Sequence, residues 1–256
     1  MSFSKDWLDL RLPADLAARN DTLAARLGAH FAGRSGLRVL DLGAGSGNNM
    51  RATAAWLPKG QTWCLVDQDA DLLAAAPRPQ DVQVETRVAD LAADIESLLR
   101  PAPDLVTASA FFDLCGAAWL SRFADALAQT GAALYAVLSY DGREEWRPAH
   151  PADQEVLTAF HRDQRRDKGF GPALGPEAHD RLITLLQTRG YTVQEGPSDW
   201  HLAPPRDAAL IAALAEGSAA AVAPDLGERA SDWRAARQIA SDVMIGHRDL
   251  LALPPR

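Results

Sequence analysis

The stretch Val39-Leu40-Asp41-Leu42-Gly43-Ala44-Gly45-Ser46-Gly47-Asn48-Asn49 decides the fold of this chain. An apolar run, typical of a buried strand, leads into a turn with glycines at alternate positions, and the turn opens a helix. Because glycine has no Cβ, such a turn bends sharply and lets a ligand approach the backbone. The start of the helix presents unpaired N–H groups and the positive end of the helix dipole, which favour a carboxylate or a phosphate. The stretch therefore predicts a ligand-binding strand-turn-helix unit.

Strand-like and helix-like segments alternate around this turn, from Leu37 to Leu138. The expected strands are Leu37–Leu42, Thr62–Val66, Val82–Val88, Leu105–Ser109 and Ala132–Leu138. The expected helices between them are Asn48–Leu57, Ala70–Ala76, Leu91–Leu99 and Ala117–Gln129. This alternation predicts an α/β fold with a parallel sheet and helices on both faces. In such sheets, ligands bind beyond the carboxyl ends of the strands, where the winding direction reverses.

The flanking segments are expected to supply further helices and strands. Apolar residues at three- and four-residue spacings predict a helical segment from Leu8 to Phe31. The stretch 139–175 is rich in Pro and Gly, and we interpret it as an insertion with one helix at about Ala152–Arg166. The remaining expected elements are a helix at Pro176–Arg189, a strand at Tyr191–Glu195, helices at about Arg206–Ala221 and Leu226–Ser241, and an antiparallel edge strand at about Met244–Leu253.

Composition and charge narrow the classes of function. The chain has 256 residues, 47% of them apolar and 23% charged, which is the balance of a packed globular protein. A net charge of −8 gives no general attraction to phosphate backbones and disfavours nucleic acid as a partner. Cys64 and Cys115 have no metal-ligand spacing, so we expect no metal site. Sparse cysteine, no basic and apolar leader, and no uninterrupted bilayer-length apolar stretch predict a cytoplasmic protein without a membrane partner.

The spacing of the glycines separates two classes of nucleotide-binding turn. Dinucleotide binders show G-x-G-x-x-G, whereas here the third glycine comes one residue earlier and an acid, Asp41, precedes the first. This variant resembles the first motif of the Rossmann-like (class I) S-adenosylmethionine-dependent methyltransferase family, over about Leu37 to Leu138. The resemblance implies a doubly wound, mostly parallel seven-stranded sheet with S-adenosylmethionine as cofactor. The chain would be one domain, with an N-terminal helical lid (1–35), a cofactor-binding core (36–138), a substrate-side insertion (139–175), and C-terminal helices and last strands (176–256).

The resemblance also assigns cofactor roles at the ends of the strands. Asp67 would bind the ribose hydroxyls, because an acid roughly 20 residues past the glycines can accept both of them. Asp90 would meet the adenine amino group, and the loop from Ser109 to Phe111 would line the pocket between cofactor and substrate. The predicted cofactor-binding residues are Arg19, Asp41, Gly43, Ala44, Gly45, Gly47, Asn48, Asp67, Gln68, Asp90, Leu91, Ser109, Ala110 and Phe111.

Other interpretations stay open at several of these positions. Asp67 and Asp90 could each cap the helix that follows, and Phe111 could belong to the core. In many family members the N-terminal helix closes over the cofactor, so either Arg11 or Arg19 is expected to pair with the methionine carboxylate.

The sequence predicts few catalytic groups, because in-line transfer from a sulfonium depends mainly on alignment. A base is needed only if the acceptor carries a proton. We expect Tyr140, just after the fifth strand, and His150, in the insertion, to be catalytic. No Asn/Asp-Pro-Pro-Tyr/Phe signature follows the fourth strand, so enzymes that methylate amino groups of nucleic acids or proteins lose support.

The hypothesis from sequence is methyl transfer to a small-molecule acceptor. A nicotinamide-dependent oxidoreductase, an aminopropyl transferase and a non-catalytic S-adenosylmethionine-binding protein remain alternatives. The sequence predicts no oligomeric state.

Overall fold

One eight-stranded sheet forms the centre of the molecule. The computed structural model describes residues 4–255. The strands are β1 (Arg38–Leu42), β2 (Gln61–Asp67), β3 (Val82–Val88), β4 (Leu105–Ser109), β5 (Ala133–Arg147), β6 (Thr192–Pro197), β7 (Trp200–Leu202) and β8 (Asp242–Leu253). Their order across the sheet is β3-β2-β1-β4-β5-β8-β6, and β7 pairs with β8 beside this path.

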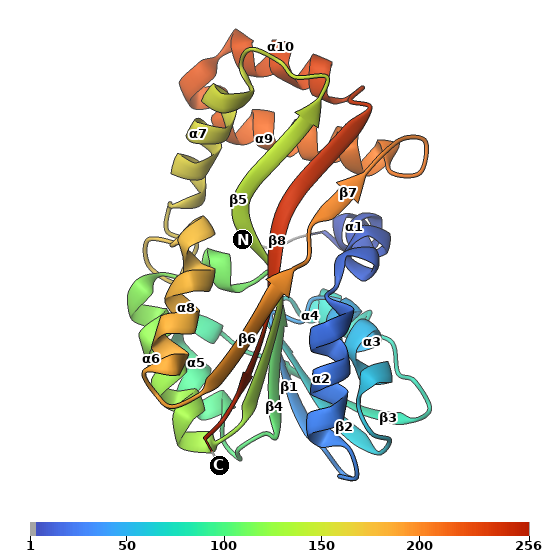
Figure 1. Ribbon diagram of the computed structural model, residues 1–256, viewed down its shortest axis with the longest axis vertical. Coiled ribbons are helices and arrows are strands. Elements are labelled where there is room, and N and C mark those ends of the chain that lie inside the picture. The colour runs from blue at the N-terminus through green and yellow to red at the C-terminus, as the bar shows by residue number, and fades with distance from the viewer. Residues whose placement is uncertain (1–3, 256) are drawn as a thin grey trace.

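Helices cover both faces of the sheet (Figure 1). They are α1 (Lys5–Ala18), α2 (Asp21–Phe31), α3 (Asn48–Thr53), α4 (Ala70–Ala74), α5 (Leu91–Leu98), α6 (Ala117–Thr130), α7 (Asp153–Gln164), α8 (Ala178–Gln187), α9 (Ala208–Leu226) and α10 (Glu228–Arg237), with the short 3-10 turns η1 (Ala54–Trp56), η2 (Phe112–Leu114) and η3 (Gly175–Glu177). The expected N-terminal helical segment is two helices, because Asn20 starts the second one by accepting the backbone N–H of Leu23.

The pairing of the strands confirms the predicted Rossmann-like fold. Strands β1 to β5 are parallel where they pair, and the winding direction reverses between β1 and β4. Strand β8 runs antiparallel to both β5 and β6. Two details of the prediction are wrong. The sheet has eight strands instead of seven, since the short β7 adds to β8, and β8 lies between β5 and β6 instead of at an edge.

Alternate residues of the central strands bury the two faces, as the pleat of a strand requires. Val39 of β1 and Tyr135 of β5 belong to the core under α2 and α3. Leu40 of β1 and Leu134 of β5 belong to the opposite core, under α5, α6 and α8. The sheet is therefore covered on both sides, which explains why its strands read as continuous apolar runs.

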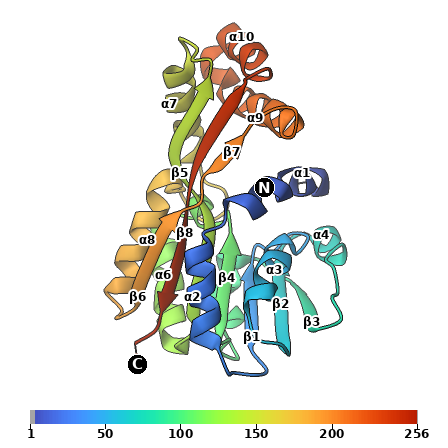
Figure 2. The same ribbon diagram turned by 45° about the vertical axis from the view of Figure 1, so that its right-hand side comes forward.

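Strands β5 and β8 stay paired and continue past the ends of the neighbouring long strands into a second lobe (Figure 2). We call this the upper lobe: α7, α9, α10, β7 and the ends of β5 and β8 that they cover. The predicted insertion at 139–175 thus begins as a strand, since β5 runs to Arg147. At the point of departure the register with β8 shifts, and Leu138 has φ 56°. Its N–H donates to the buried Asp249 (2.8 Å), which holds the bulge in place.

The upper lobe has its own apolar core. The rings of Trp146 and Trp233 meet edge to face, with centroids 5.5 Å apart, and α9 packs between α7 and α10. Within residues 4–255, α9 is the one helix whose length and composition would let it cross a membrane. Glu216 interrupts its apolar run, and its Leu210, Ile211 and Val222 are buried in this lobe. The core helix of a folded domain has the same composition.

Candidate active site

The glycine turn after β1 owes its shape to left-handed backbone at three positions. Gly43, Gly45 and Gly47 have φ 62°, 51° and 77°, a region that other residues adopt at a cost. A Cβ on Gly43 would lie 3.0 Å from the Phe111 ring, and one on Gly45 would lie 2.9 Å from Leu8. The two glycines therefore let the walls of a cavity come close to the backbone. Gly47 instead packs the start of α3 against the sheet.

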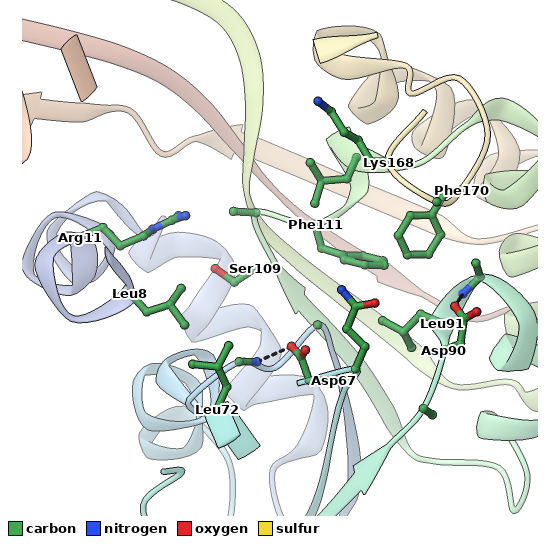
Figure 3. Close-up of a pocket in the computed structure, with 18 residues that line it drawn as sticks. Leu8, Arg11, Asp67, Leu72, Asp90, Leu91, Ser109, Phe111, Lys168 and Phe170 are labelled. Atoms are coloured by element: carbon green, nitrogen blue, oxygen red, sulfur yellow. Dashed lines mark hydrogen bonds between the residues drawn. The ribbon is translucent and has the colours of Figure 1, made fainter. Parts of the chain in front are cut away.

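A cavity of about 340 Å³ lies beside this turn, at the carboxyl ends of the strands (Figure 3). This is the edge at which α/β sheets bind ligands. The structure brings nine of the predicted cofactor residues to its wall: Gly43, Gly45, Asp67, Gln68, Asp90, Leu91, Ser109, Ala110 and Phe111.

Asp67 is fixed directly against the glycine turn. Its Oδ2 accepts the N–H of Gly45 at 2.8 Å, and its Oδ1 accepts the N–H of Asp69 at 3.0 Å. Asp69, and not Asp67, caps α4 by accepting two backbone N–H groups, so the capping alternative for Asp67 is wrong. A carboxylate has about four lone-pair positions, so Asp67 retains the capacity to accept further hydroxyls from the cavity.

Asp90 is both a helix cap and a residue of the cavity wall. It caps α5 by accepting the N–H of Ala92 at 2.8 Å, and it lines the cavity (Figure 3).

Aromatic rings form the opposite wall of this cavity. Phe111 and Phe170 meet edge to face at 5.5 Å, and Trp119 lies within 5.6 Å of both. Trp119 also donates its indole N–H to the carbonyl of Leu91 (2.9 Å). The loop that carries Phe170 is held by Asp167, which accepts the N–H groups of Gly169 and Gly171. The arrangement provides an apolar slot of the kind that holds a flat ring.

Five predicted cofactor residues do not line the cavity. Ala44 and Gly47 are structural parts of the turn, and Asn48 donates to the carbonyl of Leu8 (3.1 Å), tying α1 to the turn. Asp41 is fully buried below the turn, where Asn49 donates to it (2.7 Å) and burial raises its pKa to about 7. These residues support the turn and do not face its ligand space.

Arg19 is also directed away from the cavity. Its guanidinium donates to Asn49 (2.8 Å) and Thr53 (3.0 Å) of α3. Of the two arginines that the sequence proposed for a carboxylate, Arg11 is the one at the cavity wall (Figure 3). The prediction for Arg19 is therefore not supported. Asn49 and Thr53 of α3 accept its hydrogen bonds instead.

A second cavity, of about 150 Å³, lies between the sheet and the upper lobe. We call it the acceptor cavity, and the first the cofactor cavity. The two share three lining residues, Arg11, Ala110 and Leu114, so they adjoin at the end of β4. Ala110 has φ 50°, a strained conformation for a non-glycine residue that recurs at functional sites. The other lining residues of the acceptor cavity are Trp7, Asp113, Leu138, Tyr140, Glu144, Trp146, Phe160, Gln164, Trp200, Leu214, Ser218, Ile245 and His247.

The two predicted catalytic residues have different places. Tyr140 lines the acceptor cavity, where its hydroxyl donates to Glu144 (2.8 Å) and lies 3.0 Å from Nε2 of His161. Burial raises the pKa of Tyr140, so it keeps its proton and serves as a donor.

His150 is placed away from both cavities. Its backbone N–H donates to the carboxylate of Asp153, the first residue of α7 (2.7 Å), and its ring Nδ1 accepts the N–H of Ala152 (3.2 Å). This location argues against His150 as a base.

The acceptor cavity contains residues that the sequence did not single out. Asp113 lies four residues past the end of β4, and burial raises its pKa to about 6. Glu144 and Trp146 come from the part of β5 that the sequence placed in an irregular insertion. Only Asp113 carried a signal in the sequence, because it is an acid that closely follows the end of a strand.

Solved structures share the fold over nearly the whole chain. A protein from Bacillus halodurans, provisionally described as a methyltransferase, is 13% identical with a TM-score of 0.53, and the match covers 92% of this chain and all (100%) of that one. A cyclopropane-fatty-acyl-phospholipid synthase-like protein from Lactobacillus casei is 12% identical with a TM-score of 0.54, covering 94% and 92%. The mycolic acid cyclopropane synthase CmaA1, solved with S-adenosylhomocysteine and CTAB, is 13% identical with a TM-score of 0.54, covering 96% and 94%.

These likenesses define the class of fold. The chain has the Rossmann-like methyltransferase fold, with the sheet order and the antiparallel β8 described above. The sequence matches no family model and no curated protein. At such low identity the shared structures show the fold, and the chemistry has to be argued from this chain's own residues.

Proposed function

We propose that the protein transfers a methyl group from S-adenosylmethionine to a small-molecule acceptor. The observation that carries the proposal is the contact between Asp67 and the N–H of Gly45, at 2.8 Å, on the wall of a cavity at the sheet's switch point. The contact places a carboxylate, which can accept hydrogen bonds from both hydroxyls of a ribose, beside a glycine turn whose backbone a ligand can approach closely. The sequence motif from Asp41 to Gly47 supports the same ligand.

The residues of the cofactor cavity fit a sulfonium nucleoside. Asp67 offers carboxylate oxygens to a ribose, and Phe111, Phe170 and Leu91 offer an apolar slot to an adenine ring. Arg11 offers a cation to the methionine carboxylate from the side of α1. A cavity of about 340 Å³ lies within the usual range for small-molecule sites, roughly 300–1,000 Å³.

The chain's contribution to the reaction would be positioning. The bound cofactor supplies an electrophilic methyl group that needs no further activation. The acceptor cavity adjoins the cofactor cavity at Ala110, so an acceptor held there would face the donor. Leu8 and the loop from Lys168 to Phe170 line the cofactor cavity (Figure 3) and would exclude water. Alignment of this kind accounts for much of the rate of a two-substrate reaction.

A small acceptor suits both the volume and the charge of the protein. The acceptor cavity has room for a molecule about the size of one ring, and a net charge of −8 disfavours a nucleic-acid partner. We further propose that the protein works in the cytoplasm, as its sparse and unpaired cysteines suggest.

Calorimetric titration with S-adenosylhomocysteine and with NADH tests the proposal. We expect binding of S-adenosylhomocysteine and none of NADH. Asp67→Ala should weaken that binding roughly 100-fold, because hydrogen bonds to a charged group contribute about 1.5–3 kcal/mol each. The matched control is Asp125→Ala, which removes an exposed acid on α6 and should bind as the wild type does.

Three results would contradict the proposal. Binding of NADH alone would favour the oxidoreductase. Unchanged affinity in Asp67→Ala would remove the site assignment. Tight binding of S-adenosylhomocysteine without turnover of any acceptor in a broad panel would favour a non-catalytic binding protein.

A further inference from the structure

The acceptor cavity is walled by aromatic rings from separate elements. Trp7 comes from α1, Tyr140 and Trp146 from β5, Phe160 from α7 and Trp200 from β7. The rings of Tyr140 and Phe160 meet edge to face at 6.3 Å. The faces of such rings attract cations, most strongly where water is excluded, and Trp contributes most.

Acids outnumber cations among the residues that line the cavity, and burial raises the pKa of both acids. Asp113 and Glu144 are its acids. Of the lining residues, Arg11 is the one cation, and it is already paired with Asp15 through two hydrogen bonds of 2.9 and 3.1 Å. His247 is neutral, because burial lowers its pKa to about 3. A cationic ligand would therefore be favoured, and an anionic one opposed, by the acids.

Four residues of this wall each carry a buried polar side-chain atom that has no hydrogen-bond partner among residues 4–255. These atoms are the indole nitrogens of Trp7 and Trp200, Oδ1 of Asp113 and Oε1 of Gln164. Buried polar groups normally have partners, and leaving one without costs about 1–3 kcal/mol. Two donors and two acceptors together match a ligand that both donates and accepts hydrogen bonds.

The two acids differ in whether a carboxylate oxygen remains without a hydrogen-bond partner. The carboxylate of Glu144 accepts the Tyr140 hydroxyl (2.8 Å) and the Trp146 indole N–H (3.2 Å), so both its oxygens have partners. Asp113 keeps one oxygen without a partner and lies on η2, four residues past the end of β4 that lines the cofactor cavity. Asp113 is thus the group placed to take a proton.

Resting on the function proposed above, we propose that the methyl acceptor is a small primary or secondary amine with a second, hydrogen-bond-accepting group. The amine enters as its ammonium ion among the aromatic rings, with Asp113 and Gln164 accepting its N–H groups. The indole N–H groups of Trp7 and Trp200 donate to the second group. Asp113 acts as the general base.

The proton and electron balance is complete with the groups named. The ammonium gives one N–H proton to Asp113, and the freed nitrogen lone pair forms the bond to the methyl carbon. The carbon–sulfur bond breaks with its electron pair remaining on sulfur, giving S-adenosylhomocysteine and an N-methylated ammonium product. Asp113 then releases its proton to solvent.

Matched pairs of ammonium probes and neutral isosteres test the inference. Each pair replaces the nitrogen by carbon at constant size: ethanolamine against propan-1-ol, 5-aminopentan-1-ol against hexan-1-ol, and tyramine against 4-propylphenol. Binding is measured by ligand-observed NMR titration at millimolar concentration, with the protein saturated by S-adenosylhomocysteine. We expect at least one amine to bind about tenfold or more tightly than its partner, which corresponds to about 1.4 kcal/mol. Incubation of that amine with S-adenosylmethionine should yield its N-methyl product by mass spectrometry.

Two variants make the result specific to the cavity. Asp113→Asn should remove most of the preference for the amine, while Asp232→Asn, an exposed acid on α10 outside the cavity, should retain it. The inference is overturned if no amine is preferred, if the neutral partners bind better, or if the preference survives in Asp113→Asn. Titration of the same samples with S-adenosylhomocysteine separates the two proposals, since its failure to bind would remove the methyltransferase function itself.

Discussion

The two cavities of this protein are built in different ways. The cofactor cavity takes most of its wall from the carboxyl ends of β1, β2, β3 and β4, where backbone conformation and short side chains set its shape. The acceptor cavity takes its wall from large side chains on α1, β5, α7, β7, α9 and β8, which approach one another only in the folded chain. The first site is therefore set mainly by strand ends that sequence motifs mark, and the second by side chains that only tertiary packing brings together.

This difference has consequences for how each site tolerates change. Backbone geometry at Gly43 and Gly45 admits no side chain without displacing Phe111 or Leu8. The acceptor cavity, by contrast, is a set of rings and polar groups that single substitutions can alter one at a time. We expect changes in the turn to abolish cofactor binding, and changes in the upper lobe to alter acceptor recognition alone.

The largest effect is expected for Gly45→Val. Its φ of 51° is strained for any residue with a Cβ, most of all a β-branched one, and that Cβ would lie 2.9 Å from Leu8. It would also disturb the N–H that Asp67 accepts. Together these terms amount to about 3–5 kcal/mol, or more than 100-fold in affinity for S-adenosylhomocysteine by calorimetry.

A matched variant separates the effect of backbone strain from the effect on the binding site. Gly33 also has positive φ, 78°, but a Cβ there meets nothing within 4 Å. Gly33→Val should lose some thermal stability and keep its affinity within about twofold. Equal losses of affinity in both variants would show that the turn acts only through stability.

The next largest effect is expected for Asp113→Asn, which tests the acceptor side by pH. Burial raises the pKa of Asp113 to about 6, and Arg11 opposes that rise. As a base Asp113 must be ionised, so kcat/KM for an amine acceptor should rise with pH through about 6 and then level. The other titratable groups of the cavity wall are Arg11, Tyr140, Glu144 and His247. Burial raises the pKa of Glu144 and lowers that of His247. Asp113→Asn should lose about 100-fold in kcat/KM near pH 8.

The affinity for S-adenosylhomocysteine provides the control for this variant. It should stay within about twofold of wild type, because Asp113 does not line the cofactor cavity. A pH profile that keeps its acidic limb in Asp113→Asn would assign that limb to another group and contradict the role of Asp113.

The extent to which sequence predicts each region follows from the same contrast. The turn, Asp67, Asp90 and the Ser109–Phe111 loop were predictable, because strand ends in a parallel sheet converge by topology alone. Asp41 was assigned to the cofactor as part of the glycine motif, and Arg19 because such N-terminal helices close over the cofactor, yet Asn49 of α3 forms a hydrogen bond with each of them. The direction of a side chain is set by packing, which no local motif specifies.

The acceptor cavity was largely unpredictable for a physical reason. The segment from Asp141 to Arg147 is mostly charged and has no apolar alternation, so it reads as loop. It becomes a strand because β8 continues alongside it and supplies the hydrogen bonds. Trp200 and His247 meet there at 4.9 Å although 47 positions separate them. Contacts of this kind arise from long-range pairing, which overrides local propensity.

A smaller effect is expected for Asp41→Asn, on stability and its pH dependence. Burial raises the pKa of Asp41 to about 7, above the value of about 3.9 for an unfolded chain, although Asn49 and Arg19 lower it. The folded state then binds more protons than the unfolded state between these values, so this group's contribution to stability is lost as pH rises through about 7. Relative to Asp41→Asn, the wild type should lose about 1–3 kcal/mol of unfolding free energy between pH 5 and 8, measured by urea denaturation. Parallel pH profiles in the two proteins would show that Asp41 titrates normally.

The smallest effect is expected for Trp200→Phe, which removes one indole N–H and keeps a ring. Trp200 is buried, its N–H has no partner within the part of the chain that the structure describes, and the Arg11 guanidinium lies 5.0 Å from its ring. If that N–H donates to the acceptor, its loss should raise KM for the amine about fivefold, the effect of one neutral hydrogen bond of about 1 kcal/mol. The affinity for S-adenosylhomocysteine and kcat should hardly change, because the ring and Arg11 remain. If Trp200→Phe lost affinity for the cofactor instead, Trp200 would act through Arg11, which lines both cavities. The two sites would then be coupled, whereas we expect them to be separable.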